Sequence, residues 1–364
     1  MVYPPRPVTA PTSTTPDPSG RASLVTGGCG FLGRAVVDAL ADRGDRVTVL
    51  DHRIDPWRAD VQFVRGDICD PRLVEDAIRG HQVVFHSASL VHTKHNRLEM
   101  VRAVNIDGTR NVLHACQRTG ATRLVYVSSA SVVYDGSDII NGDESLPYAA
   151  HFPAPYAETK RIAEAEVLAA SGRASPGGSP VWTCAIRPHV VFGPGDTRLV
   201  PAILGRAREG KLKFSVGRGE KKLSDFTYVT NVVDAMLAAA ERLGPDAPIA
   251  GQAYFITNGE PMSFWDFVAQ VLPPLGHRPP RFAIPRSIAY AAAAVREAFD
   301  TYVRGGTLNA EEGLSRFAIR YICSHHYFSH ARATRDLGYV PRVRMAEGIA
   351  RTVAYFREHG AAAA

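Results

Sequence analysis

Apolar stretches rich in β-branched residues alternate with segments of helical length and periodicity through the first half of the chain. The expected strands are residues 24–25, 46–50, 61–64, 82–85, 124–127 and 181–186. Parallel strands need a crossover segment between them, usually a helix, so this alternation indicates a parallel sheet covered on both faces. The pattern therefore predicts an α/β fold.

The pattern changes at about residue 192, where proline, glycine and aromatic residues become frequent. We expect 226–229 and the helix after it to return to the main sheet. The predicted division is a nucleotide-binding domain of 21–191 and about 225–258, and a smaller substrate-binding domain of 192–224 and about 259–364 over the carboxyl-terminal edge of the sheet. Residues 1–20 hold six prolines and few large apolar side chains, which predicts a disordered tail.

Composition narrows the class of protein. Of 364 residues, 45% are apolar and 21% charged, as in a soluble protein with a large core. The net charge of +6 is scattered along the chain, so we expect no nucleic-acid partner. The five cysteines include no C-x-x-C pair, which suits free thiols in a reducing cytoplasm.

The most apolar helical run is 287–295, between Arg286 and Arg296. Nine helical residues reach ~14 Å, about half of a ~30 Å hydrocarbon core, so we predict no transmembrane span. No signal-peptide pattern opens the chain.

A glycine-rich loop follows the first expected strand and opens a helix. Gly27 and Gly30 would let the backbone approach a pyrophosphate, and Gly33 would let the helix pack closely. The first helical residues, Phe31 and Leu32, would present N–H groups to the phosphates. A second glycine pattern, Gly205-x4-Gly210-Lys211, has Leu212 where a P-loop needs Ser or Thr, and it follows a helix, so we dismiss it.

Asp51 ends the second strand about 20 residues after this loop, where a carboxylate can bind the adenosine ribose hydroxyls. A simple strand-end turn is the alternative interpretation. An acid at this place repels a 2′-phosphate, which favours NAD, whereas Arg53 could reach such a phosphate and leaves NADP open. Further expected cofactor contacts lie at the ends of the third and fourth strands, namely Asp67, Ile68, Ser87, Ala88 and Ser89.

Tyr156 and Lys160 are four residues apart, on one face of an expected helix. Oxidation of a secondary alcohol requires a base for the hydroxyl proton, and a tyrosine serves if a neighbouring ammonium and the nicotinamide lower its pKa from ~10. Lys160 would also hold the nicotinamide ribose, and Ser129 would donate to the substrate oxygen. The order of glycine loop, serine pair and Tyr–x3–Lys is more specific than any one of them.

This order resembles the extended short-chain dehydrogenase/reductase family over residues 22 to about 358. The motifs 128–136, 143–148, 187–194, 251–258 and 335–339 resemble the 3β-hydroxysteroid dehydrogenase group, and within it the decarboxylating sterol-4α-carboxylate 3-dehydrogenases. The resemblance implies a Rossmann fold with a doubly wound parallel sheet, an NAD(P) cofactor, Tyr156 as base, Lys160 beside the ribose and Ser129 as donor. It also places Ser128, Pro188, His189 and Val190 at the cofactor.

The resemblance predicts an oxidoreductase that converts the 3β-hydroxyl of a steroid or 4-carboxysterol to the ketone. With a 4-carboxylate, the product is a β-keto acid, which loses CO2 readily. The candidate substrate contacts are Ser129, Tyr134, His189, Phe192 and Arg198, with Arg218 and Lys222 as further carboxylate partners. Segments 282–288 and 317–322 would either wall a pocket for an apolar substrate or form ordinary core.

Other functions remain open at this point. They are a reductase of long-chain 2-alkyl-3-keto acids, a tailoring dehydrogenase of secondary metabolism, a nucleotide-sugar epimerase and a non-catalytic nucleotide sensor. We assign no metal, because His92, His95, His325 and His326 lack a ligand-like spacing. Relatives that pair through helices corresponding to 96–117 and 156–170 make a homodimer compatible with the sequence.

Overall fold

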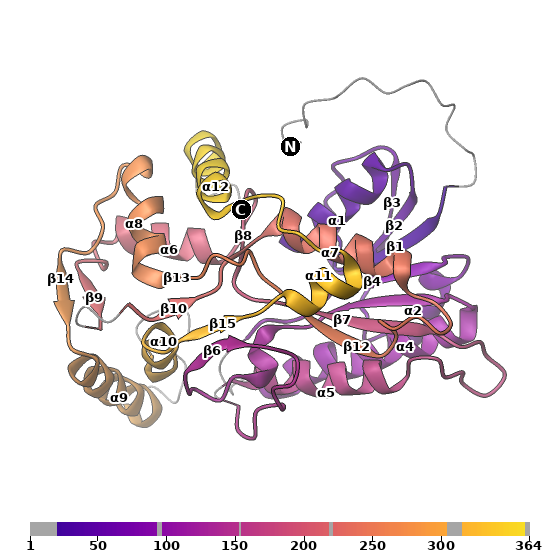
Figure 1. The fold of residues 1–364 in the computed structure, drawn as a ribbon, viewed down its shortest axis with the longest axis horizontal. Helices are drawn as coiled ribbons and strands as arrows, with labels where there is room; N and C mark the ends of the chain where they lie inside the picture. Colours follow the sequence, from indigo (N-terminus) through magenta and orange to yellow (C-terminus); the bar gives the residue numbers. More distant parts are fainter. Residues whose placement is uncertain (1–19, 93–96, 153, 218–220, 304–314, 361–364) are drawn as a thin grey trace.

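A seven-stranded parallel sheet with the order β12-β7-β5-β4-β1-β2-β3 forms the centre of the computed structural model (Figure 1). The structure describes residues 20–92, 97–152, 154–217, 221–303 and 315–360. Nearly all of the predicted N-terminal tail therefore lies outside the described residues. The predicted Rossmann-type α/β fold is confirmed.

The strands of this sheet lie close to the predicted positions. They are β1 (Ala22–Thr26), β2 (Arg46–Asp51), β3 (Val61–Arg65), β4 (Val83–His86), β5 (Arg123–Val127), β7 (Trp182–Pro188) and β12 (Gln252–Ile256). Apolar residues fill both faces of the inner strands, as expected of a parallel sheet between two helical layers.

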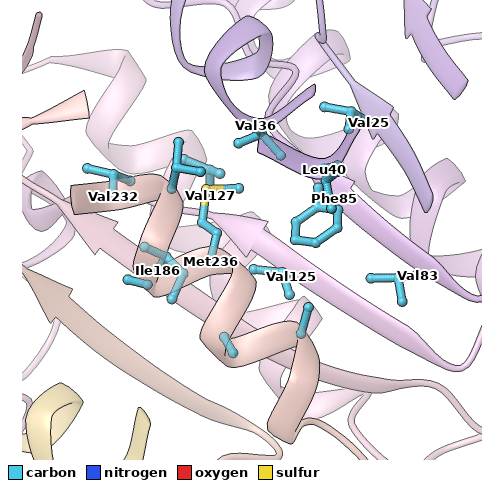
Figure 2. Close-up of a cluster of buried hydrophobic side chains, with 14 of the residues drawn as sticks. Val25, Val36, Leu40, Val83, Phe85, Val125, Val127, Ile186, Val232 and Met236 are labelled. Carbon is cyan, nitrogen blue, oxygen red and sulfur yellow. The ribbon is translucent and has the colours of Figure 1, made fainter. Parts of the chain in front are cut away.

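Helices cover the two faces of the sheet (Figure 1). One layer contains α1 (Phe31–Asp42), α7 (Val229–Arg242) and α11 (Ala331–Leu337), and the other contains α2 (Pro71–Ile78), α4 (Gly108–Thr119) and α5 (Pro155–Ala169). Figure 2 shows the first interface, where Leu40 of α1 and Met236 of α7 belong to the same buried cluster as Phe85 and Val127 of the sheet. Each such fully buried side chain contributes about 1.5–3 kcal/mol.

Residues 226–229 do not return to the main sheet as we expected. Instead, β11 (Thr227–Tyr228) pairs with β8 (Val191–Phe192) in a separate two-stranded sheet. The backbone bends after β7, where Val190 has a φ of +36°, and this bend carries β8 away from the sheet. The prediction was wrong for the strand and right for the helix: α7 packs on the main sheet, and β12 becomes its seventh strand.

The helix expected over residues 96–117 is interrupted. It begins as α3 (Leu98–Arg102), continues as a π-helical segment (Ala103–Asp107) and ends as α4. The side chain of Asn105, within the π segment, bonds the backbone of Leu90 through both N–H and C=O. The π segment thus carries a residue that anchors it to the loop after β4, and such π segments are frequent at functional sites.

The remaining elements gather beyond the carboxyl ends of the strands (Figure 1). They are a 3-10 turn (Ala130–Val133), β6 (Ile139–Gly142), α6 (Leu199–Arg208), β9 (Phe214–Val216), β10 (Leu223–Ser224), β13 (Met262–Ser263), α8 (Phe264–Val271), a 3-10 turn (Pro273–Leu275), β14 (Phe282–Ile284), α9 (Arg286–Val303), α10 (Arg316–Ile322), β15 (His326–Phe328) and α12 (Met345–His359). A four-stranded sheet of order β13-β10-β15-β6 joins several of them. Phe226 stacks on Phe267 in a second core at a centroid distance of 4.4 Å. By contrast, Ala333 and Leu337 of α11 pack in the core of the main sheet, although the predicted boundary places them in the second domain.

The apolar run 287–295 belongs to a longer helix than we predicted. Helix α9 continues past Arg296 to Val303, because arginine has a high helix propensity and does not stop a helix. Within the described parts of the chain, no helix is both long and apolar enough to cross a membrane.

Candidate active site

The glycine loop lies where the strand order reverses, between the carboxyl ends of β1 and β4. Gly27 has a φ of +68°, and a Cβ there would lie 2.7 Å from the N and Cα atoms of Ala88. At Gly33 a Cβ would lie 2.0 Å from the carbonyl oxygen of Gly27. Both positions therefore require glycine, which holds α1 and the loop after β4 close together, as a dinucleotide cradle requires.

Gly30 is the N-cap of α1 and has no side chain to cap the helix, so Phe31 and Leu32 open the helix with backbone N–H groups free of intrahelical acceptors. A helix start of this kind favours an anionic ligand. The predicted phosphate-binding residues thus lie together in one loop.

Asp51 is the last residue of β2, and its carboxylate faces the glycine loop. Its Oδ2 accepts a hydrogen bond from the Cys29 N–H at 3.0 Å, and its Oδ1 accepts one from the Arg53 N–H at 3.1 Å. The carboxylate thus lies beside the glycine loop, and the side chain of Arg53, two residues later, is exposed. Asp67 is exposed at the end of β3, and Ile68 is buried against Gly108.

A buried polar chain that the sequence analysis missed supports the loop after β4. The Thr26 hydroxyl and His86 Nδ1 lie 2.6 Å apart, and His86 Nε2 lies 2.9 Å from the Thr109 hydroxyl. Thr109 in turn donates to the Asn105 carbonyl at 2.7 Å. Burial, and then the charge of Lys160, lower the pKa of His86 to about 3, so this histidine is neutral. A histidine within an apolar strand carries no sequence signal for such a role.

Asn105 joins the same loop to α5. Its Oδ1 accepts from the Leu90 N–H at 2.7 Å, and its Nδ2 donates to the Leu90 carbonyl at 3.1 Å and to the Thr159 hydroxyl at 3.0 Å. The loop of Ser87, Ala88 and Ser89 is therefore fixed relative to the helix that carries Tyr156 and Lys160.

The phenol of Tyr156 lies at the centre of a cluster of hydroxyl groups. Helix α5 starts with Pro155 at its first position, which places Tyr156 in the first turn. The hydroxyls of Ser129 and Ser89 lie near the Tyr156 hydroxyl and act to lower its pKa. Burial raises the pKa of Tyr156 to about 12, against the lowering effect of the Arg198 charge and the two serines. Ser89, predicted as a cofactor contact, also belongs to this cluster.

Ser129 caps the 3-10 turn after β5. Its Oγ accepts hydrogen bonds from the Ser131 N–H at 3.2 Å and the Ser131 hydroxyl at 2.9 Å. Because both lone pairs of the Ser129 hydroxyl accept hydrogen bonds, this group can still donate one through its O–H. The geometry suits donation to an oxygen beside Tyr156.

Lys160 lies one turn after Tyr156 and is 2% exposed. Its ammonium donates to the Val127 carbonyl and lies 4.1 Å from the centre of the Tyr126 ring. Burial lowers the pKa of Lys160 to about 7, partly opposed by Glu164. The helix thus brings Lys160 to the carboxyl end of β5, although its hydrogen bond goes to the strand rather than to Tyr156.

Of the remaining predicted cofactor residues, one ends β7, two follow it and one follows β5. Among the described residues, the buried Ser128 Oγ has no hydrogen-bond partner, which leaves a polar atom for a ligand. Pro188 ends β7, His189 is buried against His326, and Val190 has the positive φ noted above.

The predicted substrate contacts divide into two groups. His189 and Tyr134 lie in one aromatic cluster with Tyr321, and the charge of Arg198 acts on the Tyr156 phenol. Phe192 lies apart from them: it has no exposed surface and packs on Tyr228 and Phe267, so a substrate does not reach it in this structure.

The other candidate residues make different contacts or lie outside the described residues. Lys222 pairs with Asp138 at 3.0 Å, and Arg218 lies outside the described residues. Of the histidines considered for metal, His325 accepts from the Leu223 N–H, His326 faces His189, and His95 is outside the described residues.

Two curated proteins are similar to this chain over most of its length. The mouse (Mus musculus) sterol-4-alpha-carboxylate 3-dehydrogenase, decarboxylating, is 39% identical over 332 residues, which cover 91% of this chain and 90% of the relative. The 2-alkyl-3-oxoalkanoate reductase of Stenotrophomonas maltophilia (strain K279a) is also 39% identical over 332 residues, covering 90% of this chain and 97% of the relative.

A solved structure shares the fold: the UDP-glucose 4-epimerase of Thermus thermophilus in complex with NAD has a TM-score of 0.67 at 24% identity, covering 92% of this chain and 99% of that one. Residues 24–286, more than half of the chain, match the family described as 3-beta hydroxysteroid dehydrogenase/isomerase family. The resemblance predicted from the motifs is thereby confirmed, and the chain belongs to the 3-beta hydroxysteroid dehydrogenase/isomerase family.

Proposed function

We propose that this protein is an NAD-dependent dehydrogenase that oxidises the 3β-hydroxyl of a 4-carboxysterol or a related 3β-hydroxysteroid. The observation that carries the proposal is the grouping of the Tyr156, Ser129 and Ser89 hydroxyls next to the glycine loop. Such a cluster offers a proton acceptor and a donor to one substrate oxygen at the edge of a dinucleotide site.

The residues present fit NAD. Gly27 and Gly33 leave a backbone cradle that a Cβ would fill, the start of α1 offers N–H groups, and Asp51 presents a carboxylate for the ribose. When bound, NAD supplies the acceptor for the hydride. Asp51 disfavours a 2′-phosphate by charge repulsion, so NADP is the weaker candidate, with Arg53 in the turn after β2 as a nearby cation.

In this proposal, Tyr156 accepts the proton of the substrate hydroxyl while Ser129 donates to the same oxygen. A fall in the pKa of Tyr156 from about 12 to about 7 requires roughly 7 kcal/mol of preferential stabilisation of the phenolate. The lowering by Arg198 and the two serines is already included in the pKa of about 12. The further stabilisation would come from Lys160, once its ammonium turns from Val127 toward the ribose and phenolate, and from the positive charge that NAD carries when bound.

A carboxylate on the neighbouring carbon makes the product a β-keto acid. Its C–CO2 bond then breaks, the electron pair passes into the enolate, and a proton from solvent gives the ketone. The protein need only oxidise the alcohol and hold the carboxylate.

A second candidate is the reduction of 2-alkyl-3-oxo acids, because the bacterial reductase is as similar to this chain as the mouse enzyme is. In both candidate substrates, the carbon that is oxidised or reduced is next to a carbon that bears a carboxylate. Nucleotide-sugar epimerisation is a weaker alternative that rests on the shared fold.

The test measures reduction of NAD or NADP with the steroids, and oxidation of NADH or NADPH with the oxo acid, by the purified protein. The substrates are a 3β-hydroxysteroid, its 4α-carboxylated analogue and a 2-alkyl-3-oxo acid. We expect oxidation of the carboxylated steroid with release of CO2, and loss of turnover but not of NAD binding in Tyr156→Phe. Turnover of the oxo acid alone would favour the second candidate, and an active Tyr156→Phe would exclude Tyr156 as the base.

A further inference from the structure

Tyr321 of α10 contacts two segments that follow strands of the site. Neither the sequence motifs nor the proposed mechanism uses this residue. Its hydroxyl lies 3.3 Å from Nε2 of His189, which follows β7. Its ring lies edge-on to Tyr134, at a centroid distance of 5.5 Å, and Tyr134 follows the turn that Ser129 caps. The ring also lies 4.2 Å from that of His326.

The hydrogen bonds around the two histidines decide where the Tyr321 proton points. His326 Nε2 lies 2.7 Å from the Tyr321 carbonyl, which only accepts, so Nε2 carries the hydrogen. In a neutral ring, Nδ1 of His326 is then an acceptor. His189 Nε2 lies 2.7 Å from that Nδ1 and must be the donor.

Since His189 Nε2 already carries a hydrogen, the Tyr321 hydroxyl does not donate to it. The Tyr321 oxygen instead accepts from the His189 Nε2–H, which also donates to His326. The hydroxyl proton of Tyr321 can then bond to another acceptor. The assignment requires two neutral rings, and burial lowers the pKa of His189 well below its usual value and that of His326 to about 4.

Tyr321 itself keeps its proton at neutral pH. Burial raises its pKa, and the neighbouring Tyr134, Tyr156 and Asp225 raise it further. The phenols of Tyr321 and Tyr156 are thus close enough to interact electrostatically and differ in character, because Arg198, Ser129 and Ser89 act to lower the pKa of Tyr156 alone. One phenol is suited to accept a proton, and the other to donate a hydrogen bond.

We propose that Tyr321 is a substrate-binding residue whose hydroxyl, oriented by the buried His189–His326 pair, donates a hydrogen bond to the carboxylate of a β-hydroxy or β-keto acid. This inference rests on the proposed function. We assign the donor to the substrate because α10 carries none of the cofactor-binding candidates and reaches the site from beyond the carboxyl ends of the strands (Figure 1). A carboxylate next to the reacting carbon is the acceptor that both candidate substrates share.

The test compares Tyr321→Phe with wild type on matched substrates with and without the carboxylate. The pair is a 3β-hydroxysteroid and its 4α-carboxylated analogue, or a 2-alkyl-3-oxo acid and the corresponding ketone without the carboxyl group, whichever class the wild type turns over. A hydrogen bond to a charged acceptor predicts a loss of about 10-fold to 100-fold in kcat/KM for the carboxylated member alone. Tyr327→Phe is the control, because Tyr327 lies on β15 with its ring beside His325.

His326→Gln tests the orienting role. It should raise KM for the carboxylated substrate more than it lowers kcat, and it should leave the uncarboxylated substrate nearly unaffected, which a general loss of folding would not do. Equal losses on both substrates, or none, in Tyr321→Phe would overturn the inference and leave the proposed function standing. A wild type that turns over none of the four compounds would refute the proposed function and this inference with it.

Discussion

Arg187 at the end of β7 and Glu164 on α5 form a buried two-point ion pair, with Nη2–Oε1 at 2.6 Å and Nε–Oε2 at 2.9 Å. The Tyr148 hydroxyl also donates to Glu164 Oε1 at 2.8 Å, and the guanidinium lies 5.2 Å from the centre of the Phe255 ring. Glu164 is one turn after Lys160. The pair therefore fixes the helix that carries Tyr156 and Lys160 to the strand that leads to His189.

Loss of one partner of this pair should be costly, because the other charge stays buried and unpaired. We expect Glu164→Gln to lower the free energy of unfolding by about 3 kcal/mol. Glu166→Gln is a matched control on the same helix, since Glu166 pairs with Arg110 on the surface and should contribute below about 1 kcal/mol. Urea unfolding at neutral pH measures both, and similar effects of the two variants would contradict the structural role of the buried pair.

Gly33→Ala should impair cofactor binding and folding together. The added Cβ would lie 2.0 Å from the Gly27 carbonyl oxygen, so the glycine loop and α1 would have to separate. We expect NAD affinity, measured by calorimetry, to fall at least about tenfold, since a shift of 1.4 kcal/mol suffices.

Gly205→Ala provides the control for that substitution. Gly205 lies within α6, has no atom within 4 Å of an added Cβ and has no positive φ. This variant should gain up to about 1 kcal/mol of stability from helix propensity and keep its NAD affinity. The same helical position shows that the second glycine pattern of the sequence is not a phosphate-binding loop, as we predicted.

Val190 is a β-branched residue at a φ of +36°, in the bend between β7 and β8. This conformation costs an L-residue roughly 1–2 kcal/mol, whereas glycine adopts it freely but loses about 0.5–1 kcal/mol of chain entropy. Val190→Gly should therefore raise the free energy of unfolding by up to about 1 kcal/mol. Val191→Gly, in the neighbouring strand, should lower it. A destabilised Val190→Gly would mean that side-chain packing outweighs the backbone strain.

The sequence predicted the parts of the site that depend on local spacing. The strand positions, the glycine loop, Asp51 and the Tyr156–Lys160 pair each follow from patterns within about 20 residues, and the structure places them at one edge of the sheet. Ser129 joins them because the end of β5 lies next to those of β4 and β7.

What escaped prediction depends on contacts between distant residues. His189 and His326 are 137 positions apart. The neighbouring positions of His325 and His326 in the sequence give no sign that His326 contacts His189. Similarly, Phe192 belongs to the second core because β8 pairs with β11 rather than continuing along the main sheet. No local periodicity distinguishes a pocket-lining phenylalanine from a core one.

Stability should fall between pH 6.5 and 4 in a way that depends on the buried histidines. The folded-state pKa values of His86, His189 and His326 lie below the ordinary 6.5, so in this window the unfolded chain binds more protons and the free energy of unfolding decreases as the pH falls. Each such group contributes a slope of about 1.4 kcal/mol per pH unit.

The buried carboxyl of Asp225 acts in the opposite direction, because burial raises its pKa to about 7 and the folded chain then holds the extra proton. The informative quantity is therefore the change of slope in a variant. In urea titrations at several pH values, His326→Gln should reduce the slope by about 1.4 kcal/mol per pH unit, whereas a variant with the wild-type slope would show that His326 is charged in the folded protein.

The choice between NAD and NADP should depend on Asp51. Its carboxylate is held beside the glycine loop by the Cys29 N–H. If this carboxylate binds the two ribose hydroxyls, as we propose, Asp51→Ala removes hydrogen bonds that only an unphosphorylated ribose makes. The variant should bind NAD about tenfold more weakly, as expected for the loss of a charge-assisted hydrogen bond. It should bind NADP no worse than wild type, because the repulsion of the 2′-phosphate is lost and Arg53 remains.

Asp55→Ala, which removes an exposed partner of Arg34, should leave both affinities unchanged. Equal losses for NAD and NADP in Asp51→Ala would remove this carboxylate from the ribose and leave it only the role of holding the glycine loop.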